Sequence, residues 1–129
     1  MMELTINGAV YQFNAGIGFM REANKLQKQY QNGMEKEVGL SALAGGLVDG
    51  DVEDLITVLD LMNNGQEPRI TRSTIESHIE NPETDIDALF QKVIDFLSTA
   101  NVSKKIMTKM IHYGKIMEEE QEKKMRAMI

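Results

Sequence analysis

The segment Asp85–Leu97, DIDALFQKVIDFL, constrains the fold most because its apolar residues recur with the period of an α-helix. Together they form one continuous stripe: Ile86, Leu89, Phe90, Val93 and Leu97. Acidic, amide and basic side chains occupy mainly the opposite side. An isolated helix of this kind is unstable in water, so another part of the chain must cover the stripe. The segment Asp51–Met62 repeats the spacing and is the expected partner.

The chain is 129 residues long and 42% apolar, which is enough for one modest core and argues against wholesale disorder. We expect a single domain over residues 1–129, with a β-hairpin at 2–13, a helical core at 14–100 and a long C-terminal helix with a charged tail at 101–129. The predicted fold class is therefore mainly α, a small helical domain with an N-terminal β-hairpin packed on it (α+β by strict count).

The hairpin is predicted by Asn7-Gly8, the preferred pair for a two-residue type I′ turn. This turn fixes a register that gathers apolar residues on one face. The pairs on that face are Met2 with Phe13, Leu4 with Tyr11, and Ile6 with Ala9. Because a lone hairpin is marginally stable, this face should pack on the helices.

Between the hairpin and the central stripe, the pattern predicts a helix from Asn14 to about Tyr30, closed by Gln31-Asn32-Gly33. The following segment, 35–50, is the least defined. Its glycines either loosen it or let backbones approach closely, and Ser41 is placed to begin a short helix there. Two further caps are expected, a capping box of Ser73 and Glu76, and Thr84 before the central helix.

Several function classes are disfavoured. The net charge of −6 argues against sequence-independent binding of DNA or RNA, and the absence of Cys removes thiolate chemistry. No apolar run is long enough to span a membrane, and the first residues lack the pattern of a signal peptide. The two histidines, His78 and His112, lack ligand spacing. We see no catalytic cluster, and expect neither an enzyme nor a cofactor.

Most of residues 2–100 resembles the tail assembly chaperones of long-tailed, non-contractile phages of Gram-positive hosts. The likeness lies in the opening ELTINGAVYQFNAGIGFMREANK and in GLSALAGGLVDGDVEDLITVLDLMNNG, and it continues through TRSTIESHIEN and DIDALFQKVIDFL. The Gly-Leu segment before Gly50-Asp51 is the most telling part. The final helix and its EEEQEKKMRAMI tail contribute little.

The resemblance implies a small helical protein of the host cell cytoplasm that binds and solubilises the tape measure protein and helps recruit tail tube subunits. Self-association would suit a protein that coats a long client. Such proteins are often also made in a longer, frameshifted form, in which case this chain is the short form. The alternative is a small acidic helical adaptor or regulator with one folded protein partner. A DNA-binding regulator is a weaker third, with 104–115 as its basic stretch.

The C-terminal helix carries the candidate partner-binding residues, which are Ile106, Met107, Met110, Ile111, Tyr113 and Met117. They cover more of the helix than one packing contact needs. Met110, Tyr113 and Met117 form one stripe, and Met107 and Ile111 form a separate ridge. One of the two can pack on the domain while the other remains available, and the ridge of Met107 and Ile111 is the surface chosen for a test of client binding. Methionine suits recognition of varied apolar shapes. The alternative is that both sets are core or a self-association seam.

Overall fold

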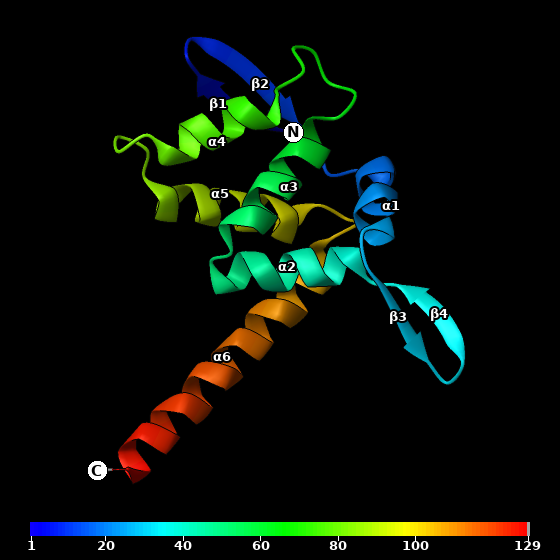
Figure 1. Cartoon of the computed structure of the whole chain (residues 1–129), viewed down its shortest axis with the longest axis vertical. Coiled ribbons are helices and arrows are strands. Elements are labelled where there is room, and N and C mark those ends of the chain that lie inside the picture. Colours follow the sequence, from blue (N-terminus) through cyan, green and yellow to red (C-terminus); the bar gives the residue numbers. More distant parts are fainter. Residues whose placement is uncertain (129) are drawn as a thin grey trace.

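The computed structural model describes residues 1–128, which form a mainly α protein with two small antiparallel sheets (Figure 1). This confirms the predicted fold class. The elements in chain order are β1 (Met2–Ile6), β2 (Ala9–Phe13), α1 (Ile17–Lys25), β3 (Lys28–Gln31), β4 (Met34–Glu37), α2 (Gly39–Asp49), α3 (Val52–Asn63), α4 (Arg72–Glu80), α5 (Ile86–Thr99) and α6 (Lys104–Ala127).

The N-terminal hairpin has the predicted register. Leu4 pairs with Tyr11, and Met2 pairs with Phe13. Asn7 and Gly8 both have positive φ, at 52° and 79°, as the turn requires. Phe13 is fully buried, while Val10 on the other face is exposed. The hairpin therefore adds its apolar face to the helical core.

The helix predicted from Asn14 to about Tyr30 is wrong at both ends: α1 begins at Ile17, with Gly16 rather than Asn14 at the N-cap position, and it ends at Lys25. The chain then forms a second hairpin, β3–β4. Asn32 and Gly33 have φ values of 54° and 75° and make its two-residue turn rather than a helix cap. All eight strand residues are exposed, and Tyr30 is 75% exposed rather than buried. This hairpin extends away from the body (Figure 1).

Helix α2 is the centre of the domain, although it lies in segment 35–50, whose glycines are compatible with more than one structure. It packs against α1, α3, α5 and α6, and begins at Gly39 rather than Ser41. A Cβ atom at Gly39 would collide with the backbone carbonyl of Ala23 in α1. At Gly46 it would collide with the carboxylate of Asp54 in α3. Gly39 and Gly46 thus let α2 pack closely on α1 and α3. Of the two interpretations of these glycines, close approach of backbones is the one that the structure supports.

The two strongest apolar stripes both enter the core. Leu55 of α3 and Val93 of α5 have no exposed surface, whereas Phe90 is only half-buried. The expected packing of the 51–62 helix on the 85–97 helix is partly wrong. Helix α5 lies closest to α6 and α2, and α3 lies against α2 and α4. The apolar spacing predicted which face of α3 and of α5 is buried, but not which helix covers that face.

Two predicted helix caps shift by one or two residues. Thr71, rather than Ser73, caps α4 by accepting from the backbone N–H of Thr74 at 3.1 Å. Asp85, rather than Thr84, caps α5 by accepting from the N–H of Ala88 at 3.0 Å.

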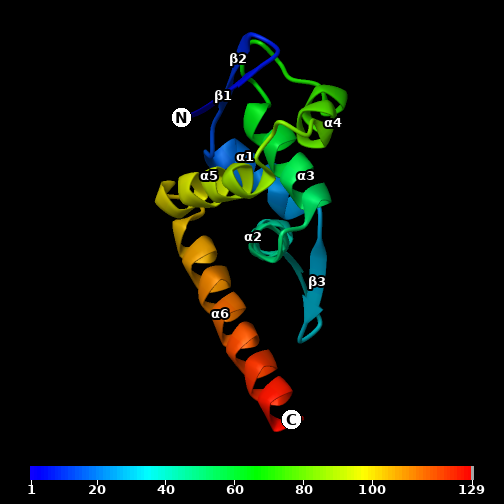
Figure 2. The ribbon, with the colours of Figure 1, turned by 90° about the vertical axis from the view of Figure 1, so that its left-hand side faces the viewer.

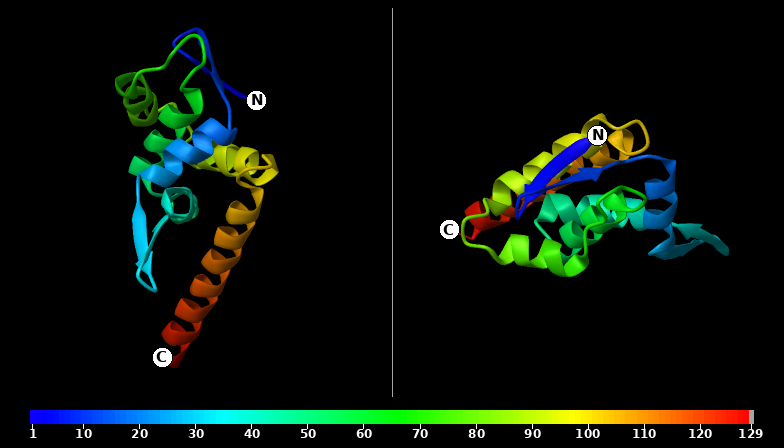
Figure 3. Two further views of the ribbon diagram at one scale, coloured as in Figure 1. Left: turned by 90° about the vertical axis from the view of Figure 1, so that its right-hand side faces the viewer. Right: turned by 90° about the horizontal axis from the view of Figure 1, so that it is seen from above.

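Helix α6 runs off the body of the domain. Its first turns lie beside α5 and α2, and the remainder extends beyond the body of the domain (Figure 2). From Lys115 to Met128 every residue is exposed. The hairpin β3–β4 and the distal part of α6 extend from the same end of the molecule, on different sides of α2 (Figure 3).

Candidate partner-binding surface

The crossing of α2 and α6 is set by glycines on both helices. A Cβ atom added at Gly114 would lie 2.9 Å from Cγ1 of Val48, and one at Gly45 would lie 3.8 Å from the sulfur of Met110. Small residues at a crossing let two helix backbones approach closely. The contact at Gly114 and Val48 therefore fixes how near α6 comes to α2.

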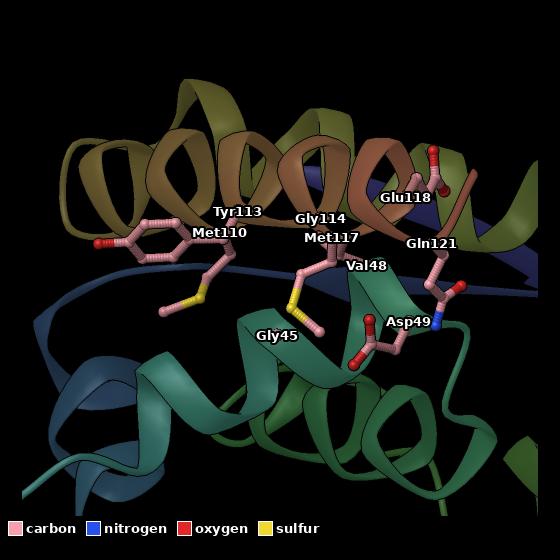
Figure 4. Close-up of a pocket in the computed structure, with 9 residues that line it drawn as sticks. All are labelled: Gly45, Val48, Asp49, Met110, Tyr113, Gly114, Met117, Glu118 and Gln121. Atoms are coloured by element: carbon pink, nitrogen blue, oxygen red, sulfur yellow. The ribbon is translucent and has the colours of Figure 1, made fainter. Parts of the chain in front are cut away.

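Where the two helices diverge from this contact, they leave a groove with a volume of about 390 Å³. Its lining residues are Gly45, Val48, Asp49, Met110, Tyr113, Gly114, Met117, Glu118 and Gln121. Figure 4 shows Met110 and Met117 pointing from α6 toward α2. Asp49 and Gln121 lie together at the end of the groove that is farther from Met110. The groove thus has a methionine wall and a polar end.

The structure separates the six predicted partner-binding residues into three groups. Met107 is fully buried, so the expectation that it remains available to a partner is wrong. Ile106, Met110 and Ile111 are half-buried against the core. Tyr113 is 49% exposed and Met117 is 61% exposed, so both are accessible to a partner. The accessible residues are therefore at the far end of the predicted set.

The physical reason for this correction is the place where α6 meets its neighbours. Ser103, at the start of α6, is buried and donates through its hydroxyl to the carbonyl of Leu97 at 2.7 Å. That bond fixes the start of α6 against the end of α5. Met107 lies one turn further on, and its side chain enters the core. By Met117 the helix has left the region that the body covers.

Sequence reasoning missed the α2 side of the groove, formed by Gly45, Val48 and Asp49. Gly45 was noted for close packing, but without a helix pairing it could not be assigned to α6. On α6, the ammonium group of Lys109 lies 5.8 Å from the ring centroid of Tyr113, which is a cation–π contact. It adds positive charge beside the Tyr113 end of the groove.

Among residues 1–128 there is no group of three or more acidic, His or Cys side chains placed to hold a metal ion. No helix in the same part of the chain has the length and hydropathy needed to cross a membrane. What the groove offers a ligand is apolar contact and charge.

The structure is thus a small, mainly helical domain with an apolar groove between α2 and α6. A family model described as "Phage tail assembly chaperone protein, TAC" matches residues 3–112. The chain therefore belongs to the phage tail assembly chaperone family. Searches of curated proteins and of solved structures gave no match. The matched range includes α1 to α5 and the first turns of α6, and it ends before Tyr113.

Proposed function

We propose that this tail assembly chaperone binds the tape measure protein in the cytoplasm of the infected cell, keeps it soluble, and helps recruit tail tube subunits. The observation that carries the proposal is the accessible methionine wall of the α2–α6 groove, formed by Met110 and Met117 beside Tyr113.

The groove suits an amphipathic helix as its ligand. A helix binds by laying its apolar face into an apolar groove. The flexible thioether side chains of Met110 and Met117 can adapt to apolar residues of different shape, which a long client with a varied sequence requires. Tyr113 adds a large surface with few rotatable bonds. Asp49 and Glu118 at the polar end favour a basic residue beside the bound apolar face.

The experiment is co-expression of this chain with fragments of the tape measure protein, followed by affinity capture and measurement of the soluble fragment. The double variant Tyr113→Asp/Met117→Asp places charge in the groove at two exposed positions, so the fold should survive. We expect capture to fall about tenfold or more, equivalent to about 1.4 kcal/mol or more of binding free energy.

Met34→Asp is the matched control, because Met34 is 73% exposed on β4, away from α6. It should capture as much fragment as wild type. Full capture by the Tyr113/Met117 variant, with an unchanged circular dichroism spectrum, would exclude the groove as the client site. A chain that captures no tape measure fragment but binds one folded tail protein would instead be an adaptor.

A further inference from the structure

The first turns of α6 carry a basic hollow on the side that faces away from the core. Lys105, Lys109 and His112 recur at the spacing of one helix face. Met107, which is fully buried, lies on the opposite side of the helix. The hollow has a volume of about 530 Å³ and is lined from the end of α5 and from α6 by Ser98, Lys104, Lys105, Thr108, Lys109 and His112. We call these six residues the lysine face.

The positive charge of the lysine face is local and is not neutralised within the domain. The chain has a net charge of −6, yet between Asp95 and Glu118 it has four lysines and no acidic residue. Lys28 and Arg69 each form an ion pair with a carboxylate, whereas within residues 1–128 no lysine of the lysine face does. An acidic ligand would therefore meet ammonium groups that no carboxylate of the domain already contacts.

The fold gains little from lysines at the start of α6. Helices α3 and α5 each begin with an Asp whose carboxylate accepts a backbone N–H, and each has an acidic residue in its first turn. Helix α6 has neither feature, and its first two residues are Lys104 and Lys105. Cations at this end of a helix oppose the helix dipole. These lysines thus cost stability, which is consistent with a role in contact outside the domain.

The hydroxyl groups of the lysine face are already used within the domain. Ser98 donates to the carbonyl of Ile94 at 2.7 Å, and Thr108 donates to the carbonyl of Lys104 at 2.8 Å. The hydrogen-bond donors left for a ligand are therefore the ammonium groups and the imidazole of His112. The methylene stems of the lysines supply apolar surface between them. A ligand that carries both carboxylates and apolar side chains matches this combination.

We propose that the lysine face binds an acidic amphipathic helix of a partner protein, whose carboxylates one turn apart contact Lys105 and Lys109. Residues four apart are separated by about 6 Å along the axis of either helix, so the two sets of charges share one period. Carboxylate–ammonium hydrogen bonds are stronger than neutral ones. Ile116, which is 39% exposed one turn beyond His112, adds an apolar contact on the same side.

The limited length of the lysine face favours a protein segment over a nucleic acid. From Lys104 to Lys115 the basic stretch spans about 17 Å, or three helical turns. Glu119, seven residues after His112, lies on the same side of α6 and ends it. A phosphate backbone that continued along the helix would meet the glutamates at 118–122, and the net charge of −6 would repel it further. A short acidic helix ends before these glutamates.

The first test is fluorescence anisotropy of the full chain with a fluorescein-labelled helical peptide of about 20 residues. The peptide combines a leucine stripe with glutamates four residues apart, and a second peptide has lysine at every glutamate position. The acidic peptide should bind saturably, one per chain, and more weakly as salt is raised. The basic peptide should not bind. Absence of saturable binding, or tighter binding of a DNA duplex of similar length, would overturn the proposal.

Charge-reversal variants identify the surface. Lys104→Glu/Lys105→Glu places acids where the helix dipole favours them, so the fold should be retained, and the peptide dissociation constant should rise about tenfold or more. Lys104→Arg/Lys105→Arg keeps the charge and should bind within about threefold of wild type. Arg21→Glu/Lys36→Glu, at exposed positions outside α6, makes the same change in net charge and should not weaken binding. An equal loss in this control would reduce the effect to overall charge and exclude the site.

The same variant distinguishes this proposal from the proposed function, on which it does not rest. Lys104→Glu/Lys105→Glu leaves the lining of the α2–α6 groove intact and should capture tape measure fragments as wild type does. A wild-type chain that binds the peptide but captures no fragment would contradict the proposed function alone. If the variant lost self-association, measured by sedimentation velocity, and kept peptide binding, the occupant would be the acidic 118–122 segment of a second copy, and the proposal would be wrong.

The position of the bound peptide is tested by carbodiimide cross-linking, which joins an ammonium group to a carboxylate in contact with it. Mass spectrometry should find the acidic peptide linked to Lys104, Lys105 or Lys109. Links found only at Lys123 and Lys124, on the distal part of α6, would place the acidic ligand elsewhere and refute the assignment of the lysine face.

Discussion

The side-chain amide nitrogen of Asn63 donates a hydrogen bond of 2.9 Å to the backbone carbonyl of Gln12, joining the end of α3 to the N-terminal hairpin. Asn63 is fully buried. Its side-chain oxygen accepts from the backbone N–H of Ile70 at 2.7 Å and from the guanidinium of Arg69 at 3.0 Å. One amide thus connects the hairpin, α3 and the loop before α4, which explains why a polar residue occupies the core.

We predict that Asn63→Ala lowers the free energy of unfolding by about 2 kcal/mol or more, because it leaves the buried N–H of Ile70 unpaired. Asn63→Asp distinguishes the hydrogen bonds that Asn63 accepts from the one that it donates to Gln12. A carboxylate can still accept from Ile70 and Arg69, but it cannot donate to Gln12. Denaturant titration should give a smaller loss for Asp, with amide exchange accelerated in the hairpin. Asn64→Ala, at an exposed position, is the control, and an equal loss there would refute the account.

A second prediction concerns the two apolar stripes. Leu55→Ala should cost about 2–5 kcal/mol, since it removes a fully buried side chain and leaves a cavity. Phe90→Ala should cost less than Leu55→Ala, because Phe90 is half-buried. Urea titration of both variants measures the difference. A larger loss at Phe90 than at Leu55 would show that the core is centred closer to α5 than the structure places it.

The sequence predicted local features better than contacts between elements. The β1–β2 register was predictable because turn type and apolar alternation agreed on Asn7-Gly8. Asn32-Gly33 is compatible with both a helix end and a hairpin turn, and the polar residues around it gave no alternation to decide between them. The hairpin β3–β4 was therefore missed.

The candidate site was only partly predictable for a related reason. Spacing identified two apolar sides of α6, but which side is buried depends on where α5 and α2 lie. Met107 and Met117 look alike in sequence, yet one is in the core and the other is accessible. The groove also needs Val48 and Gly45, whose pairing with α6 is a property of the tertiary structure.

A third prediction tests the helix crossing. Replacing a helical Gly with Ala normally stabilises by about 1 kcal/mol. Gly114→Ala should lose this gain because the new Cβ meets Val48. In a Val48→Ala background the obstruction is gone, so Gly114→Ala should be more favourable than in wild type by about 1 kcal/mol. Thermal unfolding of the four proteins completes the cycle. Gly18→Ala in α1, where a Cβ meets nothing within 4 Å, is the control and should stabilise.

The last prediction concerns Asp54, whose carboxylate lies over Gly46 at the junction of α2 and α3. Burial, followed by the nearby carboxylates of Asp51 and Glu53, raises the pKa of Asp54 above its ordinary value of 3.8. Between 3.8 and the raised pKa the folded state holds more protons than the unfolded state. The contribution of Asp54 to stability must therefore fall as pH rises through that window, and it then remains constant.

Asp54→Asn removes this titration. The substitution also removes a negative charge from the start of α3, where the helix dipole favours one, and this adds an offset to the comparison. The test is therefore the change with pH rather than the absolute stability. The unfolding free energy of the variant minus that of wild type should become more positive from about pH 3 to pH 7. Urea titrations at several pH values measure it. A difference that stays flat or declines over this range would show that Asp54 ionises in the folded protein without the cost that its burial implies.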